Sequence, residues 1–106
     1  MTDRFGLRQS TIDQIAAVFA RHTAVEKAVL YGSRAKGTHK NGSDIDLTLH
    51  GDGLNYAELS SLAGELDDLL LPYSIDLSIF AMLDDPALRG HIERVGKVFY
   101  ARSGTV

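Results

Sequence analysis

The sequence predicts one α/β or α+β domain with a β-sheet at its centre. Segments whose apolar residues recur at helical spacing alternate along the chain with short segments in which apolar and polar residues alternate. The 106 residues fit a single domain, 1–106, and contain no repeat, low-complexity run or linker that would divide it. With 44% apolar and 24% charged residues, the composition is that of a folded, water-soluble protein.

Three longer helices are expected, each beginning at a residue that can cap its first turn. Ser10 with Asp13 resembles a capping box, and apolar residues at helical spacing continue to about residue 22. Asn55 can cap a second helix, whose leucines, Leu70 included, form one apolar face until Pro72. Asp85, followed by a proline, begins a third helix that ends at about Gly96.

The strands are expected between these helices. Residues 26–31 form a short apolar run before a glycine, which indicates a buried strand. Residues 44–50 and 74–80 alternate polar and apolar side chains as half-buried strands do, and residues 98–100 can add a short fourth strand. Residues 36–43 have the glycine-rich, polar composition of a loop.

Charge and cysteine content exclude several classes of protein. A formal net charge of −3 gives no overall basic surface, so we expect no direct binding of nucleic acid. The absence of cysteine excludes disulfides and thiolate metal sites, and it suits a cytoplasmic protein. No apolar run approaches the roughly 20 residues that span a bilayer, and the N-terminus does not resemble a signal peptide, so no membrane association is expected.

Acidic residues gather on one face of the expected sheet. Asp44 and Asp46 are two residues apart on a strand, so their Cα atoms lie roughly 6.5 Å apart on the same face and both carboxylates can reach one ion. Asp76 has the corresponding place on the strand over 74–80 and joins them if the two strands are neighbours. Three unpaired acids repel one another unless a cation offsets their charge. We therefore expect a Mg²⁺ site, with two ions, that acts on phosphates.

A candidate phosphate site follows the first strand. Gly32 lets the backbone approach a ligand, and the Ser33 hydroxyl can bond a phosphate oxygen. Arg34, Lys36 and Lys40 add local positive charge, and a short helix beginning at Arg34 would direct its N-terminal amides to the same phosphate.

These residues carry a family resemblance. Gly32-Ser33, a spacer of ten residues, Asp44-Ile45-Asp46-Leu47 and the later Asp76 resemble the DNA polymerase β nucleotidyltransferase superfamily. Within it, the stretch LYGSRAKG over 30–37, followed by Ser43 and the two acids, is similar to the minimal nucleotidyltransferase (MNT) proteins over nearly the whole chain. The resemblance implies the nucleotidyltransferase fold, a small mixed β-sheet flanked by helices.

The same resemblance implies a function. MNT proteins are usually paired with an all-helical HEPN-domain partner, so the implied role is the antitoxin of a type VII toxin–antitoxin pair. It would transfer AMP from ATP to a tyrosine of the HEPN toxin and so silence it. Whether the chain forms a homo- or hetero-oligomer stays open.

Individual roles carry over onto the matching positions. The resemblance implies that Asp44 and Asp46 hold the Mg²⁺ that grips the triphosphate and that Asp76 completes the site of a second ion. Asp76 would also take the proton of the attacking hydroxyl. Gly32 and Ser33 would bind the leaving phosphates, with Arg34 and Lys36 beside them, and Ser43 would orient the start of the strand. Many relatives carry arginine at the position of Lys36, and lysine offers a point charge in place of a bidentate fork.

Two other functions remain open on the sequence. The chain could neutralise a toxin by covering it, without catalysis. It could instead transfer a nucleotide to a small molecule such as an aminoglycoside, although 106 residues leave little chain for a closed acceptor pocket.

Overall fold

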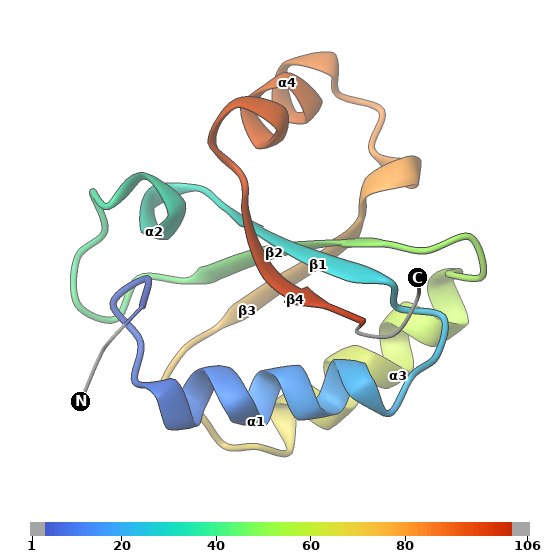
Figure 1. Cartoon of the computed structure of the whole chain (residues 1–106), viewed down its shortest axis with the longest axis horizontal. Coiled ribbons are helices and arrows are strands. Elements are labelled where there is room, and N and C mark those ends of the chain that lie inside the picture. Colours follow the sequence, from blue (N-terminus) through green and yellow to red (C-terminus); the bar gives the residue numbers. More distant parts are fainter. Residues whose placement is uncertain (1–3, 103–106) are drawn as a thin grey trace.

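A computed structural model of the chain describes residues 4–102 and contains one mixed β-sheet between two layers of helices (Figure 1). Four helices are α1 (Gln9–Ala20), α2 (Ser33–Lys36), α3 (Tyr56–Asp67) and α4 (Pro86–Val95), and a 3-10 turn, η1, spans Phe80–Met82. The strands are β1 (Lys27–Tyr31), β2 (Ile45–His50), β3 (Ile75–Ile79) and β4 (Lys97–Ala101). The predicted fold class is confirmed.

The strand order is β3-β2-β1-β4. β1 pairs antiparallel with both β2 and β4, whereas β2 and β3 are parallel and connected through α3. A parallel connection needs a crossover of a dozen or more residues, which α3 and its two loops provide. Neighbouring β2 and β3 fulfil the condition on which the predicted acidic cluster depended.

The main core lies between the sheet and the helices α1 and α3, which cover its lower face in Figure 1. On β2, Ile45, Leu47 and Leu49 are fully buried in this core, as their alternation with polar residues predicts. The opposite face is covered in part by α4, over a smaller apolar cluster that includes Val29 and Ile92.

Two helix boundaries differ from the sequence prediction. No side chain caps α1, because the backbone turn between Arg4 and Leu7 brings the chain into the helix at Arg8, two residues before the predicted cap Ser10. Asp13 instead accepts a hydrogen bond from the side chain of Gln9 at 2.9 Å. α3 ends at Asp67, several residues before Pro72, because Leu70 takes a left-handed conformation with φ +55°. Leu70 is therefore 88% exposed, and its predicted place in the core is wrong.

The predicted caps of the other two helices are present. The Asn55 side chain accepts a hydrogen bond from the Glu58 backbone N–H at 2.8 Å, and Asp85 accepts from the backbone N–H groups of Ala87 and Leu88. These bonds satisfy donors that a helix N-terminus otherwise leaves unpaired. None of the helices in the described part of the chain combines the length and the apolar character needed to cross a bilayer.

Candidate active site

The acids of the predicted site come together on the sheet. Asp46 pairs with Asp76 in the parallel register of β2 and β3 and with Tyr31 in the antiparallel register of β1 and β2. Asp44 lies just before β2 and is exposed, as is Asp76, while Asp46 is half-buried between them. Asp46 is therefore the central acid of the cluster.

The turn at Gly32 lies directly against Asp46. Gly32 has φ +78° and ψ −157°, a conformation that is essentially limited to glycine, and it precedes the first residue of α2. A Cβ atom added at this position would lie 2.4 Å from Oδ2 of Asp46. The Asp46 carboxylate thus occupies space that any side chain at position 32 would fill.

The electrostatics of Asp46 reflect this crowding. Burial raises the pKa of its carboxyl above the ordinary value, and the negative charges of Asp76 and Asp44 raise this pKa further. His91 of α4 acts in the opposite direction. The ionised cluster is costly to the protein alone, and a cation would relieve that cost.

The carboxylate oxygens of the three acids are the type of ligand that Mg²⁺ prefers. Carboxylate oxygens are hard ligands, and proteins usually bind Mg²⁺ through one or two carboxylates together with water and substrate phosphates. Within residues 4–102, no group of three or more His, Cys, Asp or Glu side chains is arranged so that it could hold an ion by itself. Asp44, Asp46 and Asp76 therefore form no closed cage, and an ion held beside them would need further ligands such as phosphate oxygens.

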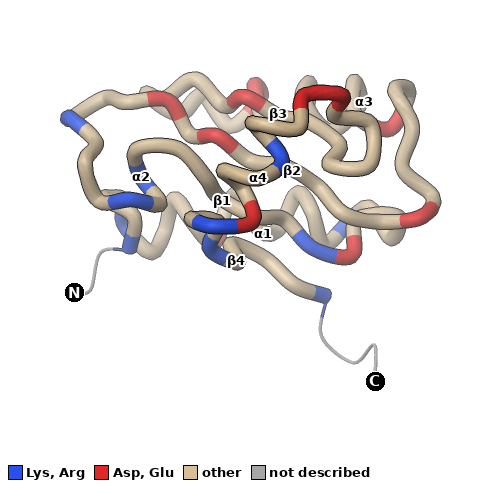
Figure 2. Tube along the Cα trace, turned by 90° about the horizontal axis from the view of Figure 1, so that it is seen from above, with Lys and Arg blue, Asp and Glu red and all other residues tan. Residues whose placement is uncertain are grey.

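Basic residues lie beside the acids. In Figure 2, Lys and Arg gather around α2 and the loop after it, and Asp residues lie along β2 and β3. Ser33 begins α2 and is half-buried next to Gly32, and Lys36 ends the helix with an exposed side chain. The structure thus places Ser33 on the turn that borders Asp46, whereas Lys36 lies at the other end of α2.

Two predicted residues are engaged with the backbone. The guanidinium of Arg34 is bound to the carbonyl oxygens of Ser43 and Phe5, so it does not extend toward a phosphate on the Gly32 turn. The Ser43 hydroxyl donates to the carbonyl of Lys40 at 2.7 Å and accepts from the Lys40 backbone N–H at 2.9 Å. Both side chains shape the loop that leads to Asp44.

The sequence reasoning missed two residues beside the acids. Tyr31 is buried, and burial raises its pKa, with a smaller effect from the charges of Asp76 and Asp46; a hydrogen bond with Ser78 opposes the shift. The ring of His91 meets the Tyr31 ring edge-on, with 6.3 Å between centroids. Alternation along β1 could have placed Tyr31 on the face of the acids, but no sequence pattern links His91 to a strand 60 residues away.

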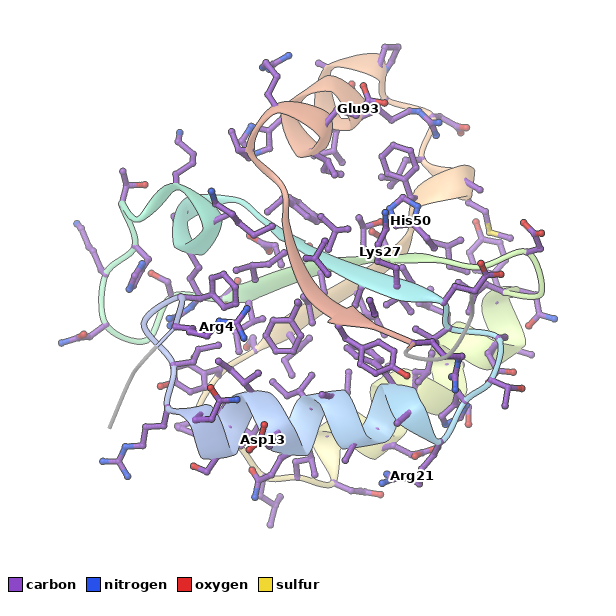
Figure 3. The ribbon with its side chains drawn as sticks, viewed as in Figure 1. Arg4, Asp13, Arg21, Lys27, His50 and Glu93 are labelled. Atoms are coloured by element: carbon purple, nitrogen blue, oxygen red, sulfur yellow. The ribbon has the colours of Figure 1, made fainter. Side chains whose placement is uncertain are left out.

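A separate cavity of about 260 Å³ lies under α4, at the other end of β2 from Asp46. Lys27, His50 and Glu93 contribute its polar lining (Figure 3), and apolar side chains such as Phe80 contribute much of the rest. None of the residues predicted for the site lines it. The cluster of acids and this cavity are distinct features of the same sheet face.

The sequence model of the family described as "Polymerase beta, Nucleotidyltransferase" matches residues 13–105. The chain belongs to this family. The match includes Gly32, Ser33 and the three acids of the cluster, so the predicted family resemblance is confirmed. No curated protein matches the chain significantly.

Solved structures share the fold of this nucleotidyltransferase domain. A chain of a toxin–antitoxin structure with AMP-PNP is 21% identical, with a TM-score of 0.70 over 87% of this chain and 74% of that chain. A chain of the toxin–antitoxin MntA-HepT is 18% identical, with a TM-score of 0.67 over 90% and 74% of the two chains. A chain of the tri-AMPylated Shewanella oneidensis HEPN toxin in complex with MNT antitoxin is 19% identical, with a TM-score of 0.65 over 89% and 72%.

Proposed function

We propose that this domain is a Mg²⁺-dependent nucleotidyltransferase that moves AMP from ATP to a tyrosine of a HEPN-domain toxin and thereby acts as the antitoxin of the pair. The observation that carries the proposal is the packing of the Asp46 carboxylate against Gly32, with Asp76 beside it in register. A turn suited to phosphates and a set of carboxylates suited to Mg²⁺ then border the same space.

The nucleotide and the acceptor are suggested by proteins of the same fold. One was solved with AMP-PNP, and another is a complex of a tri-AMPylated HEPN toxin with an MNT antitoxin. Both are less than 25% identical to this chain and share its fold. The absence of cysteine is in keeping with a cytoplasmic pair.

The proposed transfer joins the tyrosine oxygen to AMP and releases pyrophosphate. The tyrosine oxygen forms a bond to the α-phosphorus of ATP, the bond from that phosphorus to the α,β-bridging oxygen breaks, and pyrophosphate leaves. Asp76, the most peripheral of the acids across the sheet, accepts the tyrosine proton. Gly32 and Ser33 bind the departing phosphates.

Three carboxylates would hold the metal. Asp44 and Asp46 would hold the ion that accompanies the triphosphate, and together with Asp76 they would help to hold a second ion. When bound with the nucleotide, Mg²⁺ supplies the positive charge that lets these acids and the triphosphate occupy one site. The raised pKa of Asp46 is in keeping with this assignment, because burial first, and then the charges of Asp76 and Asp44, disfavour its carboxylate in the absence of a cation.

The test needs the full chain and a HEPN-domain protein, and the product of the reading frame next to this gene is the first candidate to purify. After incubation with ATP and Mg²⁺, intact mass spectrometry should show one or more adenylyl increments on the partner, and none with Asp46→Asn. Asp67→Asn, which removes an exposed acid on α3, the helix that covers the opposite face of the sheet, is the matched control and should retain the increments.

The outcome also separates the alternatives. A partner that is neutralised in the same mixture without any mass increment would show that the chain acts by covering it. Protection of cells from an aminoglycoside by this chain alone would instead favour a small-molecule acceptor.

A further inference from the structure

Arg34 is a buried cation next to the phosphate-binding turn. Only 3% of the residue is exposed, although it lies in the first turn of α2, two residues after Gly32. A charge at this depth is costly unless hydrogen bonds compensate it. Nε and Nη2 donate to the carbonyl oxygen of Ser43 at 3.1 and 2.9 Å, and Nη1 donates to the carbonyl of Phe5 at 2.9 Å. The guanidinium fork is thus committed to the backbone.

The bound segments lead into the strands that carry the acids. Ser43 immediately precedes Asp44, and Tyr73, whose ring centroid is 4.9 Å from the guanidinium carbon, lies three residues before Asp76. These two segments are also joined to each other, because the backbone N–H of Ile45 donates to the carbonyl of Ser74 at 2.9 Å. Arg34 therefore connects α2 to both acidic strands at one point.

The N-terminal turn closes the other side of this contact. Phe5 has φ +59°, which is unusual for a residue with a side chain, and its carbonyl accepts the Nη1 bond. Phe5 also stacks on Phe99 of β4, with ring centroids 6.0 Å apart. Gly6 lies so close to His39 that a Cβ there would be 2.1 Å from its Nε2. The turn is packed on several sides, which holds Phe5 in this conformation.

We propose that Arg34 is a positioning residue: by holding the Ser43 carbonyl and the Tyr73 ring, it fixes the Asp44 and Asp76 carboxylates relative to the Gly32–Ser33 turn. The role rests on the proposed nucleotidyl transfer and replaces the phosphate contact predicted for Arg34 from the sequence. Lysine cannot substitute, because a single ammonium lacks the fork that reaches both carbonyls.

Arg102 offers a matched control for the test. Its guanidinium also binds backbone carbonyls, with Nε 3.2 Å from that of Val25 and Nη2 2.7 Å from that of His22, at the opposite end of α1. Arg34→Lys and Arg102→Lys therefore remove the same kind of bond. Only the first lies beside the acids.

The experiment measures two properties of the full chain. Calorimetry with Mn²⁺ and AMP-PNP gives the affinity for metal with nucleotide, and ¹H–¹⁵N NMR follows the backbone amide of Asp44, both at a temperature where every variant is folded. Arg34→Lys should weaken the affinity about 10- to 100-fold, the range for outer residues that orient metal ligands, and should shift or broaden the Asp44 amide signal. Arg102→Lys should leave both unchanged.

Each outcome has a distinct meaning. If the wild-type chain does not bind Mn²⁺ with AMP-PNP, the proposed function fails, whatever Arg34 does. If the wild type binds and Arg34→Lys binds equally well, or if both lysine variants weaken binding alike, the positioning role is overturned. Should Arg34→Lys not fold, Tyr73→Leu removes the ring alone; a smaller loss of affinity with a shifted Asp44 amide is expected, and unchanged values overturn the role.

Discussion

Replacing Gly32 by alanine should lower both the stability of the fold and the activity of the proposed site, and the two losses have different causes. The φ of +78° and ψ of −157° cost a residue with a side chain about 1–3 kcal/mol. In a domain of this size, each kcal/mol lowers Tm by about 4–8 °C. The new Cβ would also lie 2.4 Å from Oδ2 of Asp46, so the carboxylate has to retreat by about 1 Å to reach ordinary contact distance.

The effect on activity follows from that displacement. A misplacement of about 1 Å in a group that orients reacting atoms can lower a rate about 100-fold. Adenylyl transfer to the partner, measured by intact mass against time, should therefore slow by about two orders of magnitude in Gly32→Ala. Binding of Mg²⁺ with AMP-PNP should weaken in parallel, because the displaced group belongs to the proposed metal ligands.

Gly37→Ala is the control for backbone strain. Gly37 also has φ +78°, but a Cβ there meets nothing within 4 Å. It should lower stability by about 1–2 kcal/mol and leave transfer unchanged at a temperature where both variants are folded. A Gly32→Ala protein that transfers AMP at the wild-type rate, or a Gly37→Ala protein that is equally slow, would refute the reasoning.

Three further predictions concern stability. The ring nitrogens of His22 contact the carboxylates of Glu58 and Glu65, and these contacts raise the pKa of His22 against the effect of burial. The resulting stabilisation is complete below about pH 6.5, the pKa of an unfolded histidine, and is lost as pH rises through the raised pKa of the folded protein. The urea midpoint of the wild type should therefore fall as pH rises through this range, and that of His22→Gln should not. Asp46→Asn should raise the Tm of the ligand-free protein at pH 7, because the folded state raises the pKa of Asp46 and so disfavours its charged form. The same variant should lose the Tm increase that Mg²⁺ with AMP-PNP gives the wild type. A lower ligand-free Tm would contradict the prediction. Asp85→Ala removes the cap of α4 and should lower the free energy of unfolding, measured in urea, by about 1 kcal/mol. Asp84→Ala, which replaces an exposed acid and leaves the cap at Asp85 in place, should not change it.

Much of the fold could be predicted because local patterns and packing agree. Alternation along β2 identified the buried face, and the caps at Asn55 and Asp85 determined where α3 and α4 begin. The start of α1 and the end of α3 could not be predicted in the same way. They depend on a backbone turn at residues 4–7 and on a left-handed Leu70, and neither Phe5 nor Leu70 is a residue type that commonly takes a positive φ.

The positions of the candidate site residues on the sheet could be predicted, but their contacts could be predicted less well. The place of the acids followed from strand alternation and from the neighbouring β2 and β3. Arg34 was expected to bind phosphate because it is a cation near Gly32, and the sequence does not reveal that carbonyls of Phe5 and Ser43 surround it. His91 depends on how α4 crosses the sheet, which is decided by tertiary packing.

The register of β2 connects the core to the proposed chemistry. Side chains alternate strictly along a strand, so a shift of one residue would expose Ile45 and Leu47 and would turn Asp46 into the core. Burial of these apolar residues therefore also directs Asp46 toward Gly32 and Asp76. The fold tolerates the repulsion among the acids because the register that creates it also secures the core. Core substitutions on β2 that loosen this register should consequently weaken nucleotide binding, although they lie on the opposite face from the acids.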